Sequence, residues 1–125
     1  MAMKPQLIDL LEAMKALGLK PMHELSPVDA RIQMEAGVKA RDFPTVVVGE
    51  VEDRTVPGPA GEIPVRTYRP ANASGATGAL VYFHGGGHVI GSPDSHDSVA
   101  RAMCRGAGVF VLSVDYRMGP EAEFS

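Results

Sequence analysis

The sequence is poor in cysteine, in long apolar runs and in basic charge, and each shortage excludes a class of protein. Its one cysteine, Cys104, has no partner for a disulfide within the chain, which suits a reducing cytoplasm. The longest apolar runs, Ala79–Phe83 and Val109–Leu112, are far shorter than the ~20 residues that cross a bilayer. Acidic residues outnumber basic ones by 15 to 12, which disfavours nucleic acid and anionic membranes as partners. We therefore expect a cytoplasmic globular protein without a membrane span or a nucleic-acid partner.

The N-terminal third of the sequence has the pattern of two short helices. Apolar residues recur at helical spacing after Pro5, which suits a first helical turn, and the stripe stops at Gly18. Ser26 is the expected N-cap of a second helix, and Gly37 is its expected end. Two amphipathic helices ahead of any strand cannot bury their apolar faces alone. We therefore predict a helical cap segment over residues 1–44.

Residues 45–125 change from helical periodicity to the pattern of a sheet. Two segments rich in β-branched residues flank a Pro/Gly turn, which predicts an antiparallel hairpin. Two short strands, expected to be buried, have a helix between them, which predicts a right-handed crossover and a parallel pair. We expect this core to be incomplete without residues beyond 125, with the last strand in need of a neighbour on its open side. The predicted elements are strands 46–56 and 62–69, strand 79–83, a helix capped by Asp94 or Ser95 and ended by Gly106 and Gly108, and strand 109–114.

Three consecutive glycines follow the strand that ends at Phe83. His84 precedes them, and the triplet is Gly85, Gly86 and Gly87. Glycines at a strand's end let the backbone turn with its N–H groups unobstructed and aimed at one point. Such donors can hold a developing oxyanion, often the largest single contribution to acyl-transfer catalysis. The pattern predicts an oxyanion loop, although the sequence contains no Gly-x-Ser-x-Gly to supply its nucleophile.

A second block, Asp115–Glu121, follows the last predicted strand. With His84–Gly87, Val89–Ser92 and His96-Asp97, it resembles the hormone-sensitive-lipase-like esterases of the α/β-hydrolase superfamily, in which this block usually reads Tyr-Arg-Leu-Ala-Pro-Glu. The resemblance implies the α/β class and the N-terminal portion of an α/β-hydrolase fold. It also implies a carboxylesterase that acts on a small-molecule ester with a Ser-His-Asp triad and no cofactor. Its nucleophile, acid and base would lie beyond residue 125, on the remainder of the esterase, in the same or a separate chain.

The same resemblance implies a role for four residues of the loop. Gly86 and Gly87 would donate their backbone N–H groups to the oxyanion. His84 would order the loop as a structural residue, not act as the catalytic base. His88 stands where the family usually has a bulky aromatic residue, so it would make that wall of the substrate pocket polar and titratable.

Two other functions remain open from the residues alone. The spacing Gly85-x-Gly87-x-x-x-Gly91, answered by Asp115, is compatible with a dinucleotide site. Against this reading, the segment after Gly91 delays the helix, and the acid lies further along the chain than the ~20 residues usual for such a site. A truncated homologue that binds without catalysis is the third function considered.

Metal binding and a local catalytic triad are not expected. The spacing of His84 and His88 suits zinc only on a helix, and the three glycines between them prevent one. Ser92 and His96 lie close in sequence at a helix start, where capping is the ordinary role for such residues.

Overall fold

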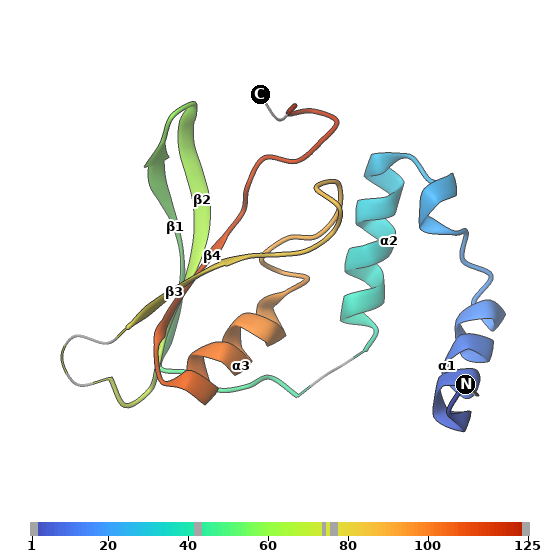
Figure 1. Ribbon diagram of the computed structural model, residues 1–125, viewed down its shortest axis with the longest axis horizontal. Helices are drawn as coiled ribbons and strands as arrows, with labels where there is room; N and C mark the ends of the chain where they lie inside the picture. The colour runs from blue at the N-terminus through green and yellow to red at the C-terminus, as the bar shows by residue number, and fades with distance from the viewer. Residues whose placement is uncertain (1–2, 42–43, 74, 76–77, 124–125) are drawn as a thin grey trace.

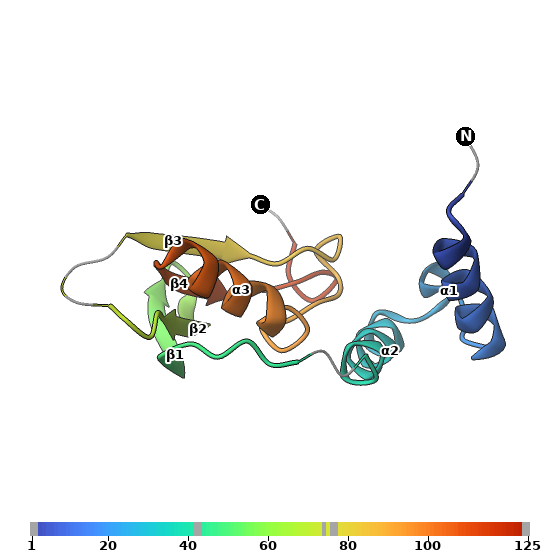
Figure 2. The ribbon, with the colours of Figure 1, turned by 90° about the horizontal axis from the view of Figure 1, so that it is seen from below.

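A mixed sheet of four strands forms the centre of the structure, a computed structural model that describes residues 3–41, 44–73, 75 and 78–123. One helix lies against the sheet, and two N-terminal helices lie to one side (Figures 1 and 2). This arrangement confirms the predicted α/β class. In chain order the elements are α1 (Pro5–Ala16), a short 3-10 turn η1 (Met22–Glu24), α2 (Pro27–Lys39), β1 (Glu50–Gly58), β2 (Gly61–Arg69), β3 (Ala79–Phe83), α3 (Asp97–Ala107) and β4 (Phe110–Val114).

The predicted hairpin is present, but its first strand begins later than expected. Strands β1 and β2 pair antiparallel from Glu50 opposite Arg69 to Gly58 opposite Gly61. Residues 46–48 lie outside the ladder because this segment runs along α3 instead. There Val48 packs against the core and the Val46 carbonyl accepts a hydrogen bond from Arg101 at 3.4 Å. The start predicted at residue 46 is therefore wrong, since packing against the helix replaces strand pairing.

The order of the strands, β1-β2-β4-β3, differs from one expectation. Strand β4 pairs in parallel with β3, which confirms the crossover, and antiparallel with β2 on its other side. The expectation that strand 109–114 has an open side is therefore wrong: within the described residues β4 is paired on both sides, and the edge strands of the sheet are β1 and β3. One face of β3 is also exposed, with Val81 56% and Phe83 62% exposed, because α3 packs on the other face of the sheet and no other described helix packs against it. The prediction of a buried strand is therefore wrong for those residues.

The core lies between the sheet and α3, which packs against β2 and β4. Tyr68, Ala100, Cys104 and Val111 are fully buried there. Burial raises the pKa of the Cys104 thiol, which fits a small packing residue better than a reactive one.

Local capping explains where the helices begin and end. The Asp29 amide donates to the Ser26 hydroxyl at 3.1 Å, which confirms Ser26 as the cap of α2. The end predicted at Gly37 is wrong, because the helical ladder continues past it and the Ala40 amide donates to the Ala36 carbonyl. Gly108, in the left-handed conformation, closes α3 as expected.

Helix α3 begins at Asp97, after the cap positions predicted at Asp94 and Ser95. The Ser95 hydroxyl accepts from the Ser92 amide at 2.8 Å, and the His96 amide donates to the Ser92 carbonyl. The serine side chain therefore closes a separate turn and is not available to cap the helix.

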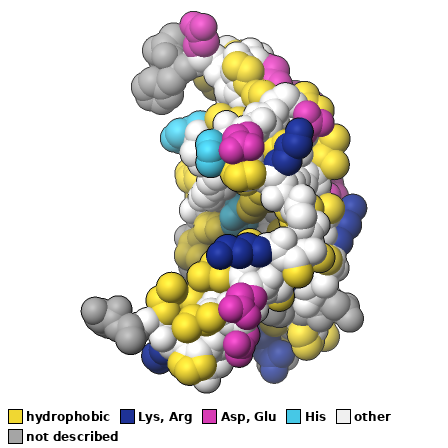
Figure 3. Space-filling view, turned by 90° about the vertical axis from the view of Figure 1, so that its right-hand side faces the viewer, with side chains coloured by type: hydrophobic (Ala, Val, Ile, Leu, Met, Phe, Trp, Pro, Cys, Tyr) yellow, Lys and Arg dark blue, Asp and Glu magenta, His cyan; other side chains and the backbone are white. Residues whose placement is uncertain are grey.

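Helix α1 contributes no buried residue to the described structure. Its apolar residues are exposed on the face of the molecule shown in Figure 3. Among the described helices, none combines the length and the apolar character needed to cross a membrane. The division into a cap over 1–44 and a core over 45–125 stays a prediction.

Candidate active site

The backbone after β3 makes a tight turn that requires glycine at Gly86. Its φ is +138°, and a Cβ there would lie 1.8 Å from the Ile90 carbonyl oxygen. The turn is closed by the amides of Val89 and Ile90, which donate to the Gly86 carbonyl at 3.2 and 3.0 Å. Because its carbonyl is engaged on the inside of the turn and its Cα has no room for a side chain, Gly86 is held closely in place.

The other glycines of the loop are under different constraints. Gly87 has a φ of +61°, a backbone conformation that favours glycine, but the space around it could hold a side chain. Gly85 has neither constraint. Gly91 has a φ of +101°, and a Cβ there would lie 2.6 Å from both the Gly85 carbonyl and the His84 ring. Gly91, part of the spacing expected for a dinucleotide site, here leaves the space in which the His84 ring lies.

His84 is buried, with 3% of its surface exposed, beneath the glycine loop. Its Nδ1 lies 3.0 Å from the Gly85 carbonyl, and its ring stacks on Tyr116 and His96 at centroid distances of 4.5 and 5.2 Å. Burial, with the neighbouring His84 adding to it, lowers the pKa of His96. The Tyr116 hydroxyl also donates to the His84 carbonyl at 2.6 Å. These contacts support the proposal that His84 orders the loop.

The block after β4 holds the same loop from the opposite side. Besides the Tyr116 contact, the Gly119 amide donates to the His88 carbonyl at 2.8 Å. His88 has a φ of +59°, an uncommon conformation for a residue other than glycine. The two stretches of sequence that carry the family resemblance, 84–92 and 115–121, thus form one unit at the end of strands β3 and β4.

Helix α2 reaches this unit through Arg31, which the sequence analysis did not single out. The Arg31 Nε donates to the Val89 carbonyl at 2.7 Å, and Nη2 donates to the Gly119 carbonyl at 2.8 Å. The guanidinium also makes a bidentate pair with Glu121, at 2.8 and 2.9 Å. No local sequence signal marks this residue, because its partners lie far along the chain.

Arg31 lowers the pKa of Glu121 from 4.5 to about 2, chiefly through these hydrogen bonds. A lowered carboxylate pKa contributes stability above the ordinary pKa, and this contribution is lost as the pH falls from 4.5 toward about 2. The ion pair therefore stays charged across the neutral range.

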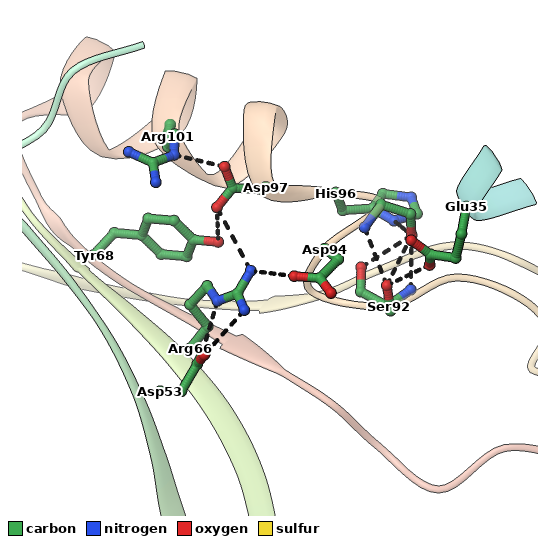
Figure 4. A network of polar contacts seen from close by, with 10 residues as sticks. Glu35, Asp53, Arg66, Tyr68, Ser92, Asp94, His96, Asp97 and Arg101 are labelled. Carbon is green, nitrogen blue, oxygen red and sulfur yellow. Dashed lines mark hydrogen bonds and ion pairs between the residues drawn. The ribbon is translucent and has the colours of Figure 1, made fainter. Parts of the chain in front are cut away.

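The far end of the loop is held by a second set of polar contacts (Figure 4). Arg66 of β2 lies between Asp53 and Asp94, with hydrogen bonds of 2.6–3.0 Å and 2.7 Å. The pairing lowers the pKa of Asp53. The Tyr68 hydroxyl donates to Asp97 at 2.9 Å, and its pKa is raised, first by burial and then by that bond. These contacts join β2 to the segment before α3, through Asp94, and to the first turn of α3, through Asp97.

His88 is exposed and lies on the wall of an open groove. Phe83, Val114 and Tyr116 line the same groove, together with the turn of the β1–β2 hairpin. This apolar surface beside a polar imidazole supports the proposal that His88 contacts substrate.

The structure gives no support to the two alternative site chemistries. The described residues contain no group of three or more His, Cys, Asp or Glu side chains placed to hold a metal. Helix α3 starts at Asp97, well past Gly91, so its N-terminus does not open on the glycine loop as a dinucleotide site requires.

Comparison with known proteins agrees with the geometry. A family model described as the alpha/beta hydrolase fold matches residues 80–125. Carboxylic ester hydrolase LipN of Mycobacterium tuberculosis is 49% identical over 94 residues, which cover 75% of this chain and 24% of LipN. Ethyl acetate hydrolase of Pseudomonas putida is 36% identical, covering 99% of this chain and 41% of that protein.

Solved structures show the same relationship. The hyperthermophilic esterase of the archaeon Pyrobaculum calidifontis is 36% identical with a TM-score of 0.85, covering 99% of this chain and 39% of the esterase. An ester hydrolase from the metagenome of Lake Arreo is 34% identical with a TM-score of 0.87, covering 98% and 40%. The chain thus spans 24–41% of the length of these relatives. It belongs to the α/β-hydrolase superfamily and matches the N-terminal part of its hormone-sensitive-lipase-like carboxylesterases.

Proposed function

We propose that this chain supplies the oxyanion loop and the cap of a longer carboxylic-ester hydrolase. The observation that carries the proposal is the turn at Gly86 and Gly87, in which Gly86 has no room for a side chain and Gly87 has a positive φ. Contacts from the block after β4 and from α2 hold this turn in place. The esterase relatives support the same reaction class. The remainder of the esterase is the proposed partner, and a cytoplasmic location stays a prediction from composition.

In this mechanism the chain acts on the charge that develops during acyl transfer. The backbone N–H groups of Gly86 and Gly87 donate to the carbonyl oxygen of the ester as it becomes an oxyanion. His84 holds the loop from below and takes no proton from substrate. The nucleophile, acid and base come from residues beyond 125.

Ester hydrolysis by the full-length protein is the expected result that tests this function. Short-chain p-nitrophenyl esters should be hydrolysed with saturable kinetics, and a serine-directed organophosphonate should abolish the activity. The chain 1–125 alone should give no turnover above a buffer blank, because it contains no Gly-x-Ser-x-Gly. Full-length protein that is folded but inactive on all esters would favour a non-catalytic homologue. Saturable, phosphonate-sensitive turnover by 1–125 would contradict the assignment of the nucleophile to the remainder.

Replacing His88 with phenylalanine should change substrate binding in the full-length protein. The substitution replaces a polar imidazole on the groove wall by an apolar ring without hydrogen-bonding groups, so KM should change. The oxyanion donors stay in place, so kcat should change less. His23→Phe, at an exposed position of η1, is the matched control. Identical KM values in wild type and His88→Phe would remove His88 from the substrate site.

A further inference from the structure

Helix α2 is attached to the rest of the structure mainly by polar contacts. Among its described residues only Ala30 is buried, so apolar packing contributes little to its placement. Its side-chain hydrogen bonds to the core involve Arg31 and Glu35, which are four residues apart and therefore lie on one face of the helix. The Ser92 hydroxyl donates to the Glu35 carboxylate at 2.6 Å (Figure 4).

Both contacts fall on the segment that closes the oxyanion turn. Arg31 binds the carbonyl of Val89, and Glu35 binds the side chain of Ser92. Between these two points Ile90 contributes the amide that donates to the Gly86 carbonyl. The Gly86 carbonyl and the Gly87 N–H belong to one planar peptide group, so a shift of α2 would pull on the backbone that fixes the direction of the Gly87 N–H and, next to it, the position of Gly86.

The Arg31 guanidinium links the glycine loop to the block after β4, two segments that are distant in sequence. It donates to the Val89 carbonyl in the loop, to the Gly119 carbonyl in the block after β4, and to the Glu121 carboxylate. Gly119 in turn donates to the His88 carbonyl, which closes a ring of contacts around the glycine loop. Losing the guanidinium would leave the Val89 and Gly119 carbonyls without this donor and would break the ion pair.

We propose that Arg31 is a positioning residue that couples the seating of the cap helix α2 to the geometry of the oxyanion loop. This inference rests on the proposed function, since it assigns a consequence for ester hydrolysis to a contact between cap and core. If the inference holds, loss of the Arg31 contacts weakens stabilisation of the transition state and therefore lowers kcat, not only the binding of substrate.

The test compares variants of the full-length protein. Arg31→Gln should lower kcat on the order of 10–100-fold, because a misplacement of about 1 Å at the reacting groups costs that much. KM should change much less. Arg31→Lys should restore only part of the activity, because an ammonium cannot reproduce the planar fork that reaches two carbonyls and a carboxylate. Arg54→Gln, which breaks the exposed pair between Arg54 and Glu52, is the matched control and should behave as wild type.

Hydrogen exchange provides a readout that does not depend on activity. Amides of residues 86–92 should exchange faster in Arg31→Gln than in wild type, while those of the core strand β4 should not change. Unchanged exchange in the loop, or an unchanged kcat in folded Arg31→Gln, would overturn the coupling. Wild-type protein that hydrolyses no ester but shows faster loop exchange in Arg31→Gln would refute the proposed function and leave the physical coupling between α2 and the loop supported.

Discussion

Replacing Gly86 with alanine in the full-length protein is expected to lower kcat by ~10²–10³, equivalent to ~2.7–4 kcal/mol, with a smaller change in KM. The new Cβ would lie 1.8 Å from the Ile90 carbonyl oxygen, far closer than two non-bonded atoms can approach, so the turn must open. Opening the turn moves the Gly86 N–H away from the oxyanion. The measurement is steady-state kinetics on a p-nitrophenyl ester, with circular dichroism to show that the variant is folded.

Two neighbouring glycines provide graded controls for that result. Gly85→Ala should have a kcat close to wild type, because a side chain at Gly85 would meet open space and its φ is not positive. At Gly87 an alanine side chain would meet open space, but the φ of +61° is strained for any residue with a Cβ. Gly87→Ala should therefore lower the free energy of unfolding by roughly 1–2 kcal/mol. A folded Gly86→Ala variant with near-normal kcat, or an equal loss in Gly85→Ala, would remove the oxyanion assignment from Gly86.

Replacing His84 with alanine is expected to reduce both stability and kcat. Cutting a large buried side chain to alanine costs roughly 2–5 kcal/mol, and here it also removes the ring that supports the loop between Tyr116 and His96. Because His84 is proposed to order the loop and not to accept a proton, the shape of the pH–rate profile should be retained. Thermal unfolding and the pH dependence of kcat/KM measure the two effects.

The matched control for this prediction is His23→Ala. His23 has an exposed side chain in η1, so its removal should affect neither quantity. Loss of the acidic limb of the pH–rate profile in His84→Ala, with the melting temperature unchanged, would mean that His84 acts as the base.

Features with a local cause could be predicted from the sequence. The cap at Ser26 and both ends of strand 79–83 were predicted correctly, because each depends on a few adjacent residues. The order of the strands could not be predicted, because no local signal shows which strand of the parallel pair lies beside the hairpin. Strand β4 is the one that pairs with β2, which leaves β3 at the edge.

The candidate site shows the same division between local and distant causes. A glycine triplet after a strand indicates an oxyanion loop, but the sequence does not distinguish Gly86 from Gly87. That difference comes from the chain turning back at Ile90. Arg31 was missed because its partners, Val89 and Glu121, are distant in sequence and no periodic pattern connects them.

The most direct test of the central claim is a crystal structure of the full-length protein with a phosphonate bound covalently to its nucleophile. The phosphonyl oxygen stands in for the oxyanion of the tetrahedral intermediate. We expect it to lie within ~2.7–3.1 Å of the backbone nitrogens of Gly86 and Gly87. An oxygen hydrogen-bonded by other groups, with both glycine N–H groups directed away from it, would contradict the account.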